Sequence, residues 1–362
     1  MIKQVATAFE HKDYQTAAKL IKQLLKETPE DPWVHFYLGQ LHEVSGKRQQ
    51  AEKIYRQLLR NTTNTKIVNQ SRQRLQRLQE IEQEERQRAI SKATSEPSHA
   101  EPGVLVLEPL ATELKTTAAP KFAQIMQLDP YSARLMLPSR GWRLYRTGQV
   151  GELQFYGQQL QQVGIPCFWT TIAAIKQIQV FQVKHFSESD PKPTVVCRNQ
   201  ENQFGSLTFD WSEVTARVVG MLPIFEQVID VDSRHQLEWK TKTQDHAQFC
   251  DLHLPSRNCI LRLYDHGYEF QKGIEIADQA SQNTITINWN SLVQWIFKQI
   301  PQVKTWSNFT HFAETALDQT EMLGNIQPHI HLLRREKTNW DPAFHLYSGL
   351  VFVNELKNCL GS

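Results

Sequence analysis

Four arginines and two aromatic residues gather in one short stretch of this sequence. They are Arg134, Arg140, Arg143 and Arg146, with Trp142 and Tyr145 among them. A guanidinium group is a planar fork that can bind a phosphate, or the O6 and N7 edge of guanine, through two hydrogen bonds. Aromatic neighbours can stack on a base. The stretch therefore has the composition of a nucleotide-binding site.

The chain repeats this stretch further on. Leu137–Gly148 reads LPSRGWRLYRTG, and Leu254–Gly267 reads LPSRNCILRLYDHG. A second pair of segments, Leu207–Pro223 and Ile285–Pro301, aligns without a gap, and a looser echo runs from Phe344 to Phe352. The order of the motifs is the same in both halves, which predicts two unequal copies of one α/β unit.

Two related turns would suit a ligand with two equivalent halves, such as a symmetric cyclic dinucleotide. We expect arginines to contact its phosphates or guanine edges, aromatic rings to stack on its bases, and a carboxylate to accept from guanine. The predicted ligand-binding residues are Arg140, Trp142, Arg143, Arg146, Trp169, Asp210, Arg257, Arg262 and Tyr264. The alternative is that these arginines pair with carboxylates such as Asp129 or Asp265, and that the motif serves folding alone.

Other residue patterns are weaker candidates for chemistry. The sequence contains no GxSxG, P-loop, GxGxxG or HExxH motif, so we expect no enzyme and no cofactor. His329 and His331 would share one face of a strand, as a metal pair requires, but no third ligand is placed. Asp230 and Asp232 could form an acid–base or Mg²⁺ pair, as in a nuclease or phosphodiesterase. Cys250 and Cys259 are most simply buried thiols.

Composition limits the class of protein. The chain has 362 residues, 40% hydrophobic content and a formal charge of +2. It is long enough for two or three domains with real cores, and its charge does not indicate binding to a nucleic-acid polymer. No stretch approaches the roughly 20 apolar residues of a membrane helix, and the N-terminus lacks a signal-peptide core. Five cysteines without CxxC or zinc spacing suit a reducing cytoplasm, where we expect the protein.

The N-terminal part resembles tetratricopeptide repeats. The positions that carry the resemblance are Ala17, Leu24 and Pro29, then Leu38, Gly39, Gly46, Ala51 and Tyr55. About three such repeats are needed for a stable core, so we expect a helix from about Thr65 to Ala93 to cap them. The repeats suit either a packing or dimerisation scaffold or a groove that binds peptides.

The predicted fold is α+β. Tetratricopeptide-like α-hairpins over residues 1–92 precede a linker over 93–120 and a duplicated α/β domain over 121–362, with copies of about 121–234 and 235–362. A short apolar run interrupts the linker at Val104 to Leu110, and it suits either an isolated strand or a docking segment. In the first copy we expect strands at 133–137, 142–146, 166–171, 178–186, 194–199 and 206–210 and helices at 151–163, 173–177 and 211–219. In the second we expect strands at 262–270, 283–289, 329–333 and 344–354 and helices at 290–299 and 310–323.

Together, the repeats and the motifs LPSRGWRLYRTG, GIPCFW, SLTFDWSEV and CDLHLPSRNCILRLYD resemble a cyanobacterial family of tetratricopeptide-containing cyclic di-GMP receptors. The resemblance implies a non-enzymatic cytoplasmic receptor that binds cyclic di-GMP and controls cell size through a protein partner, such as a transcription regulator. The sequence has no DxSxxG motif, so a PilZ-type site is not predicted. The alternative function is a tetratricopeptide adaptor or assembly factor without a small-molecule ligand.

Overall fold

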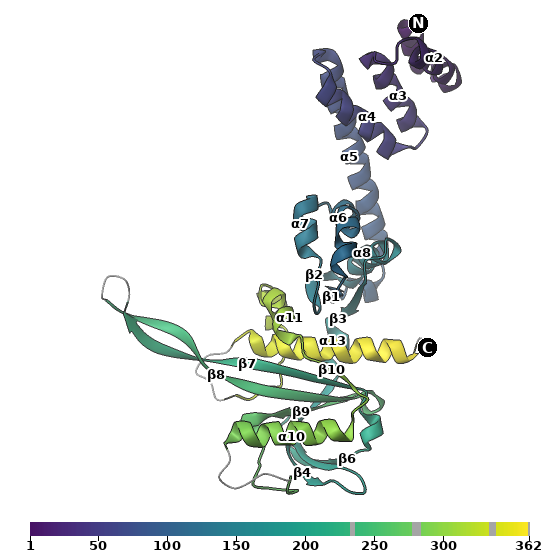
Figure 1. Ribbon diagram of the computed structural model, residues 1–362. Coiled ribbons are helices and arrows are strands. Elements are labelled where there is room, and N and C mark those ends of the chain that lie inside the picture. The colour runs from purple at the N-terminus through teal and green to yellow at the C-terminus, as the bar shows by residue number, and fades with distance from the viewer. Residues whose placement is uncertain (232–235, 277–283, 333–337, 361–362) are drawn as a thin grey trace. The chain divides into compact units, whose positions relative to one another are not determined.

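The computed structural model describes residues 1–231, 236–276, 284–332 and 338–360, with the backbone alone at 230–231 and 358–360. The chain divides into two compact units, residues 1–92 and residues 93–362. The first unit is helical and the second contains two β-sheets, so the protein is α+β. Figure 1 shows the elements of both units.

Helices alone build the first unit. They are α1 (Ile2–Glu10), α2 (Tyr14–Glu27), α3 (Pro32–Val44), α4 (Arg48–Asn61) and α5 (Thr65–Ala93), and α5 has the predicted bounds. Asp13 and Asp31 cap α2 and α3 by accepting from the backbone N–H groups of Thr16 and Trp33. Gly46 adopts a φ of +73° between α3 and α4, where a side chain would be strained.

The second unit contains a three-stranded and a seven-stranded sheet. The small sheet has the order β2-β1-β3, and the large sheet has the order β10-β7-β8-β9-β4-β5-β6. The strands are β1 (Pro102–Leu107), β2 (Arg143–Gln149), β3 (Cys167–Thr171), β4 (Gln179–Glu188), β5 (Thr194–Arg198), β6 (Phe204–Thr208), β7 (Ala216–Val231), β8 (Leu237–Leu254), β9 (Cys259–Tyr264) and β10 (Lys304–Trp306). Pairing is antiparallel except between β10 and β7 and between β4 and β9.

Helices cover these sheets. They are α6 (Thr112–Met126), α7 (Pro130–Met136), α8 (Val150–Gln162), α9 (Ile172–Lys176), α10 (Ile285–Gln299), α11 (Phe309–Ala316), α12 (Thr320–Gly324) and α13 (Trp340–Leu360), and short 3₁₀ turns lie at Pro97–Ala100, Trp211–Glu213, Pro255–Arg257 and Asp265–Gly267. Figure 1 shows α13 and α10 on opposite faces of the large sheet.

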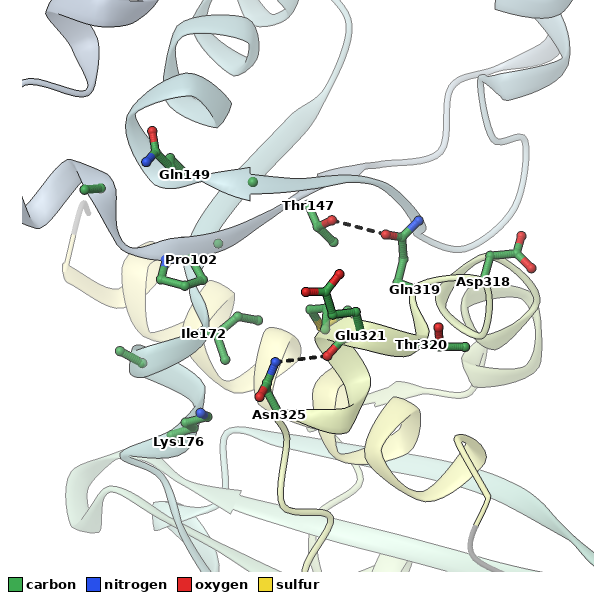
Figure 2. Close-up of a pocket in the computed structure, with 15 residues that line it drawn as sticks. Pro102, Thr147, Gln149, Ile172, Lys176, Asp318, Gln319, Thr320, Glu321 and Asn325 are labelled. Carbon is green, nitrogen blue, oxygen red and sulfur yellow. Dashed lines mark hydrogen bonds between the residues drawn. The ribbon is translucent and has the colours of Figure 1, made fainter.

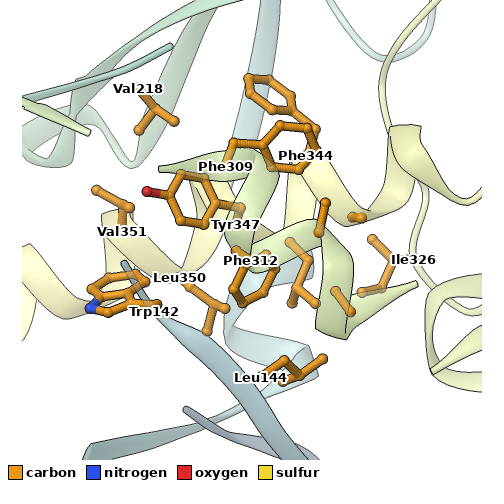
Figure 3. Close-up of a cluster of buried hydrophobic side chains, with 14 of the residues drawn as sticks. Trp142, Leu144, Val218, Phe309, Phe312, Ile326, Phe344, Tyr347, Leu350 and Val351 are labelled. Atoms are coloured by element: carbon orange, nitrogen blue, oxygen red, sulfur yellow. The ribbon is translucent and has the colours of Figure 1, made fainter. Parts of the chain in front are cut away.

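Two apolar cores hold the second unit together. The first joins Val104 and Leu144 of the small sheet to Val218 of the large sheet, with α13 between the sheets. Figure 3 shows Phe312, Phe344 and Tyr347 at its centre. The second core lies between α10 and the other face of the large sheet. Burial of this kind stabilises a fold by roughly 25 cal/mol per Å² of apolar surface.

The predicted linker is wrong where it covers β1. The apolar run of this strand forms the centre of the small sheet, pairing with both β2 and β3. Its residues Val104 to Leu107 are fully buried. The remainder of residues 93–120 includes the first half of α6. Of the two expectations for this run, an isolated strand or a docking segment, the structure shows a strand, although one that is paired on both sides.

Two elements of the first predicted copy differ from the sequence prediction. The predicted strand 133–137 lies in helix α7, because Asp129 caps the helix by accepting from two N–H groups and Pro130 suits its first position. The predicted helix 211–219 is a 3₁₀ turn followed by β7. In β7 the β-branched Val218 pairs with β8 on one side and β10 on the other.

Three further predicted strands are wrong. Residues 284–289 belong to α10 or its cap, because the Thr284 side chain accepts from the Ile287 N–H. The segment 344–354 belongs to α13, whose residues 342–352 are all buried, because the helix lies between the two sheets. Residues 329–332 are not in a strand. The strands predicted at 142–146, 166–171, 178–186, 194–199 and 206–210 and the helices at 151–163, 173–177 and 290–299 are present within a few residues.

The structure does not support two copies of one unit. Leu137–Gly148 leads from a helix into β2 of the small sheet, whereas Leu254–Gly267 leads from β8 into β9 of the large sheet. The second aligned pair has even less in common. Leu207–Pro223 runs into strand β7, whereas Ile285–Pro301 is almost entirely helix α10. The repeated sequence motifs therefore form different secondary structures in different sheets.

Among the helices that the structure describes, none combines the length and the apolar composition that crossing a bilayer requires.

Candidate functional site

The first arginine motif forms a turn that is anchored by buried residues. Leu137 and Trp142 are 2% and 4% exposed, and the Trp142 ring lies 4.6 Å from the ring of Trp306. Gly141 has a φ of +63° and lies against Asn308. Trp142 is therefore a core residue in this structure, and its ring offers no surface for a base. The turn exposes Arg140 to solvent.

Other predicted residues of this half have partners within the chain. The Arg146 guanidinium pairs with Glu152 at 2.6 Å and lies over the ring of Tyr156. Trp169 packs against α8, where a Cβ added to Gly157 would lie 2.3 Å from its ring. Arg143 is half-buried, and its Nη1 donates to the Leu135 carbonyl over 3.4 Å.

Arg257 and Asp210 belong to a surface network beside the large sheet. Arg257 donates to both carboxylate oxygens of Glu213 over 2.6 and 2.7 Å, and to the Thr208 carbonyl. These hydrogen bonds lower the pKa of Glu213 to about 2. Asp210 accepts from the Ser212 N–H, which caps the turn that presents Glu213.

Arg262 and Tyr264 are buried in strand β9. Both carboxylate oxygens of Asp251 accept from Arg262, over 2.9 and 2.7 Å, and neither side chain is exposed. Tyr264 stacks on Phe249 at 5.3 Å between ring centroids. A ligand cannot reach either residue in this structure.

The predicted ligand-binding residues therefore do not form one site here. They are distributed over both sheets and the turns beside them, and Trp142, Arg262 and Tyr264 are core residues. The alternative of arginine–carboxylate pairing describes Arg146, Arg257 and Arg262, although with other partners than expected. Asp129 caps α7, and Asp265 accepts from the Gln248 N–H and from His266.

A buried polar network surrounds Asp251, and no local sequence pattern indicated it. The Ser348 hydroxyl donates to Asp251 over 2.6 Å, and His253 Nε2 lies 3.0 Å from the same hydroxyl. Burial lowers the pKa of His253 to about 4. Because Ser348 donates to a carboxylate and the group is closed to solvent, this arrangement differs from a nucleophilic triad, in which histidine takes the serine proton.

The other sequence candidates are two histidines, two aspartates and two cysteines. His329 and His331 lie outside any strand, and burial lowers the pKa of both. In the described ranges, no three His, Cys, Asp or Glu side chains are arranged to hold a metal ion. Cys250 and Cys259 are buried, and burial raises their pKa values to about 12 and about 11. The carboxylates of Asp230 and Asp232 and the thiol of Cys359 lie outside the described side chains.

A pocket of about 870 Å³ lies where the edge of the small sheet meets α9 and α12. Figure 2 shows Lys176, Glu321 and Asn325 around it, and Thr147 bonded to Gln319 at 3.1 Å. The pocket is open and mixes one ammonium group with two carboxylates and several amides. This lining selects no ligand class, and none of its residues was predicted from the sequence.

The first unit shows the close helix packing that its small residues predicted. Ala17 and Ala51 are fully buried. A Cβ added to Gly39 would lie 2.6 Å from the ring of Tyr55, so α3 and α4 approach each other at this glycine. The Glu43 carboxylate lies beside the Tyr55 hydroxyl and pairs with Arg74 of α5 at 3.3 Å. These contacts join α3, α4 and α5 into one body.

A row of partly exposed aromatic rings crosses the first unit. Phe9 of α1 stacks on Tyr37 of α3 at 5.6 Å, and Tyr37 stacks on Trp33 at 6.2 Å. The Lys66 ammonium of α5 lies 5.8 Å from the Trp33 ring. We call these four residues the aromatic row. It lies on the first helix of each hairpin and ends at a cation, a combination that can hold an apolar side chain and a carboxylate.

Comparison with known proteins finds a match only for the first unit. A tetratricopeptide repeat family model matches residues 8–75. No curated protein and no solved structure matches the chain. The matched range begins in α1 and ends in α5, and therefore includes the aromatic row. The protein thus contains a tetratricopeptide repeat region, a class of helical repeat that suggests interaction with other proteins.

Proposed function

We propose that this protein is an adaptor whose tetratricopeptide unit binds a peptide segment of a partner protein. The observation that carries the proposal is the aromatic row, whose rings remain partly exposed across α1 and α3. Aromatic side chains give large contact area at low conformational cost and dominate many protein interfaces. The matched repeat family supports the same role.

The charge of the first unit indicates which kind of peptide it would bind. Residues 1–92 contain 17 Lys and Arg against 11 Asp and Glu. Lys66 sits at the end of the aromatic row, so the favoured segment carries an apolar side chain for the rings and a carboxylate for Lys66. Charge complementarity of this kind mainly raises the association rate and selects partners.

A display library of short random peptides, selected on the full chain, tests this proposal. Trp33→Ala should weaken the selected peptide by about 2 kcal/mol, a typical loss at an interface aromatic residue. Because Trp33 also packs against Phe36, this variant tests folding as well as binding. Lys66→Glu, at an exposed side chain, should weaken binding without unfolding the unit.

Phe204→Ala is the matched control, because Phe204 is an exposed aromatic residue of the second unit. It should leave peptide affinity unchanged. Selected peptides that bind Trp33→Ala and Lys66→Glu as tightly as the wild type would show that the aromatic row is not the binding surface.

The narrower function, a receptor for cyclic di-GMP that controls cell size, stays a prediction from the resemblance. Arg140 favours it, because this side chain is exposed and, among the described residues, pairs with no carboxylate. Isothermal titration with cyclic di-GMP tests it, with cyclic di-AMP and GTP as controls. Binding of cyclic di-GMP but of neither control, with lower affinity in Arg140→Ala, would support the receptor function. If none of the three nucleotides gave a heat of binding, the receptor function would be excluded and the adaptor function would stand.

A further inference from the structure

The second unit carries a surface of four cations and two exposed apolar side chains at the end of α7. Its residues are Lys115, Tyr131, Arg134, Leu135, Arg140 and Arg143, which we call the α7 patch. Tyr131 and Leu135 are 74% and 62% exposed. They stand one helical turn apart and therefore share a face of α7, with Arg134 beside them. Scattered apolar residues are normal on a surface, but here they adjoin a cluster of charge.

Hydrogen bonds to carbonyl groups hold the cations near one another. Arg143 donates to the Leu135 carbonyl, and Lys115 Nζ donates to the Leu137 carbonyl. Both carbonyls belong to the end of α7, where cations are favourable because the helix dipole is negative there. Arg140 follows three residues later in the turn that Trp142 anchors. The cations are thus positioned by the fold.

No carboxylate neutralises this surface. In the part of the chain that the structure describes, none of the four cations makes an ion pair. Partial burial lowers the pKa of Lys115, and the charges of Arg134 and Arg143 lower it further, so these three cations are close enough to repel one another. Asp129 is engaged by the N–H groups of Tyr131 and Ser132 at the opposite end of α7. An anionic partner would relieve this repulsion.

We propose that the α7 patch binds an acidic segment of a partner protein that also carries apolar side chains. Three arginines favour carboxylates, which they can bind with two hydrogen bonds each. Tyr131 and Leu135 require apolar side chains, which inorganic anions lack. A nucleic acid or an anionic membrane is disfavoured, because residues 93–362 contain 27 Asp and Glu against 23 Lys and Arg and would repel an extended negative surface.

This surface adds a second protein-binding site to the proposed adaptor and does not depend on the first. The aromatic row lies in residues 1–92 and the α7 patch in residues 93–362. With both sites occupied, the chain would link two partners, and the affinity of the assembly would depend on their joint geometry.

The test uses the full chain and a fluorescent peptide of alternating Glu and Leu with a photoreactive group at one end. Fluorescence anisotropy measures its affinity, and mass spectrometry maps the cross-links. We expect cross-links between residues 114 and 143, and an affinity loss of about tenfold or more in Arg134→Glu/Arg140→Glu. Affinity should also fall as salt rises from about 0.1 M to about 1 M, where the Debye length shrinks from about 10 to about 3 Å.

Lys176→Glu/Lys298→Glu is the charge-matched control. Both lysines are exposed on other elements of the same unit, so this variant should bind the peptide normally. A peptide that cross-links only to residues 1–92, and whose affinity falls in Lys66→Glu and not in Arg134→Glu/Arg140→Glu, would overturn the α7 patch while leaving the tetratricopeptide site intact. A loss of binding in Arg134→Glu/Arg140→Glu that is absent from Lys66→Glu and from the lysine control would support the α7 patch.

Competition experiments distinguish an acidic protein segment from other anions that could bind the α7 patch. Inorganic phosphate at millimolar concentration should displace the peptide no better than chloride at equal ionic strength. Efficient displacement by cyclic di-GMP or by a duplex oligonucleotide would assign the patch to a nucleotide or to nucleic acid, and would contradict an acidic protein segment.

Discussion

Arg257 and Arg262 are close in sequence, and each binds one carboxylate with two hydrogen bonds, yet their surroundings differ. The pair of Arg262 and Asp251 is fully buried, whereas the side chains of Arg257 and Glu213 are 38% and 24% exposed. Removing one member of a buried pair leaves an uncompensated charge, which typically costs about 3–5 kcal/mol, whereas exposed pairs contribute about 0–1 kcal/mol. The difference in burial thus makes Arg262 important for stability and Arg257 much less so.

Arg262→Met should therefore lower the free energy of unfolding by about 3–5 kcal/mol. Arg257→Met is the matched control and should lower it by about 1 kcal/mol or less. Urea unfolding followed by tryptophan fluorescence measures both. Equal losses in the two variants would mean that burial of the Arg262 pair has been overstated, and that Arg262 is still a candidate for ligand binding.

The sequence identified residue types that bind anions but not their accessibility. Arg140 and Arg257 both end a PSR motif, and Arg262 begins an RLY motif that also occurs at Arg143. These repeated motifs do not show which arginines are exposed, because exposure depends on the fold. Asp251, the partner of Arg262, lies eleven residues earlier on the neighbouring strand, and Ser348 lies on a helix that the sequence predicted as a strand. Contacts between distant segments have no local pattern, so the network could not be predicted.

At the scale of elements, the small residues of the first unit set how closely its helices pack. Gly39→Ala should destabilise this unit by about 1–3 kcal/mol, because the added methyl group would overlap the Tyr55 ring. Gly205→Ala is the control, since nothing lies within 4 Å of a Cβ there. Thermal unfolding followed by circular dichroism measures the difference. An unchanged melting temperature in Gly39→Ala would show that α3 and α4 do not meet closely at this position.

Elements with clear local signals were predicted correctly, and elements defined by their neighbours were not. Helix α8 has apolar residues at helical spacing, and α5 continues an amphipathic pattern, so both were found. Helix α13 is buried on nearly all sides between two sheets, so its mostly apolar sequence lacks helical periodicity and resembles a strand. Strand β7 follows a capped 3₁₀ turn at Trp211–Glu213, and the two together occupy the segment that was predicted as one helix. In both cases tertiary packing overrode the local pattern.

At the scale of the whole molecule, stability should fall in mild acid. Burial lowers the pKa of His253 and His329 to about 4, and holds that of His345 well below its usual value. The unfolded chain, with histidine pKa values near 6.5, binds more protons than the folded chain between pH 6.5 and pH 4. The stability from these neutral histidines is therefore complete above pH 6.5 and is lost as pH falls through this window, by roughly 1.4 kcal/mol per pKa unit and residue.

His345→Leu tests this pH dependence. The Nδ1 atom of His345 is buried without a hydrogen-bond partner, so an apolar replacement should leave stability at pH 7 unchanged or higher. Because the variant lacks one titrating group, its loss of stability between pH 6.5 and pH 4.5 should be smaller than that of the wild type. Denaturant unfolding at several pH values gives both curves, and identical slopes would exclude His345 as a source of the acid sensitivity.

The central claim is that the tetratricopeptide unit binds a peptide through the aromatic row. Backbone amide hydrogen exchange of the full chain, with and without a peptide selected on it, tests this claim most directly. The account predicts slower exchange in α1, α3 and the first turns of α5 when the peptide is bound, and no such slowing in Lys66→Glu. Slower exchange confined to residues 93–362 would contradict the claim and place the peptide on the second unit.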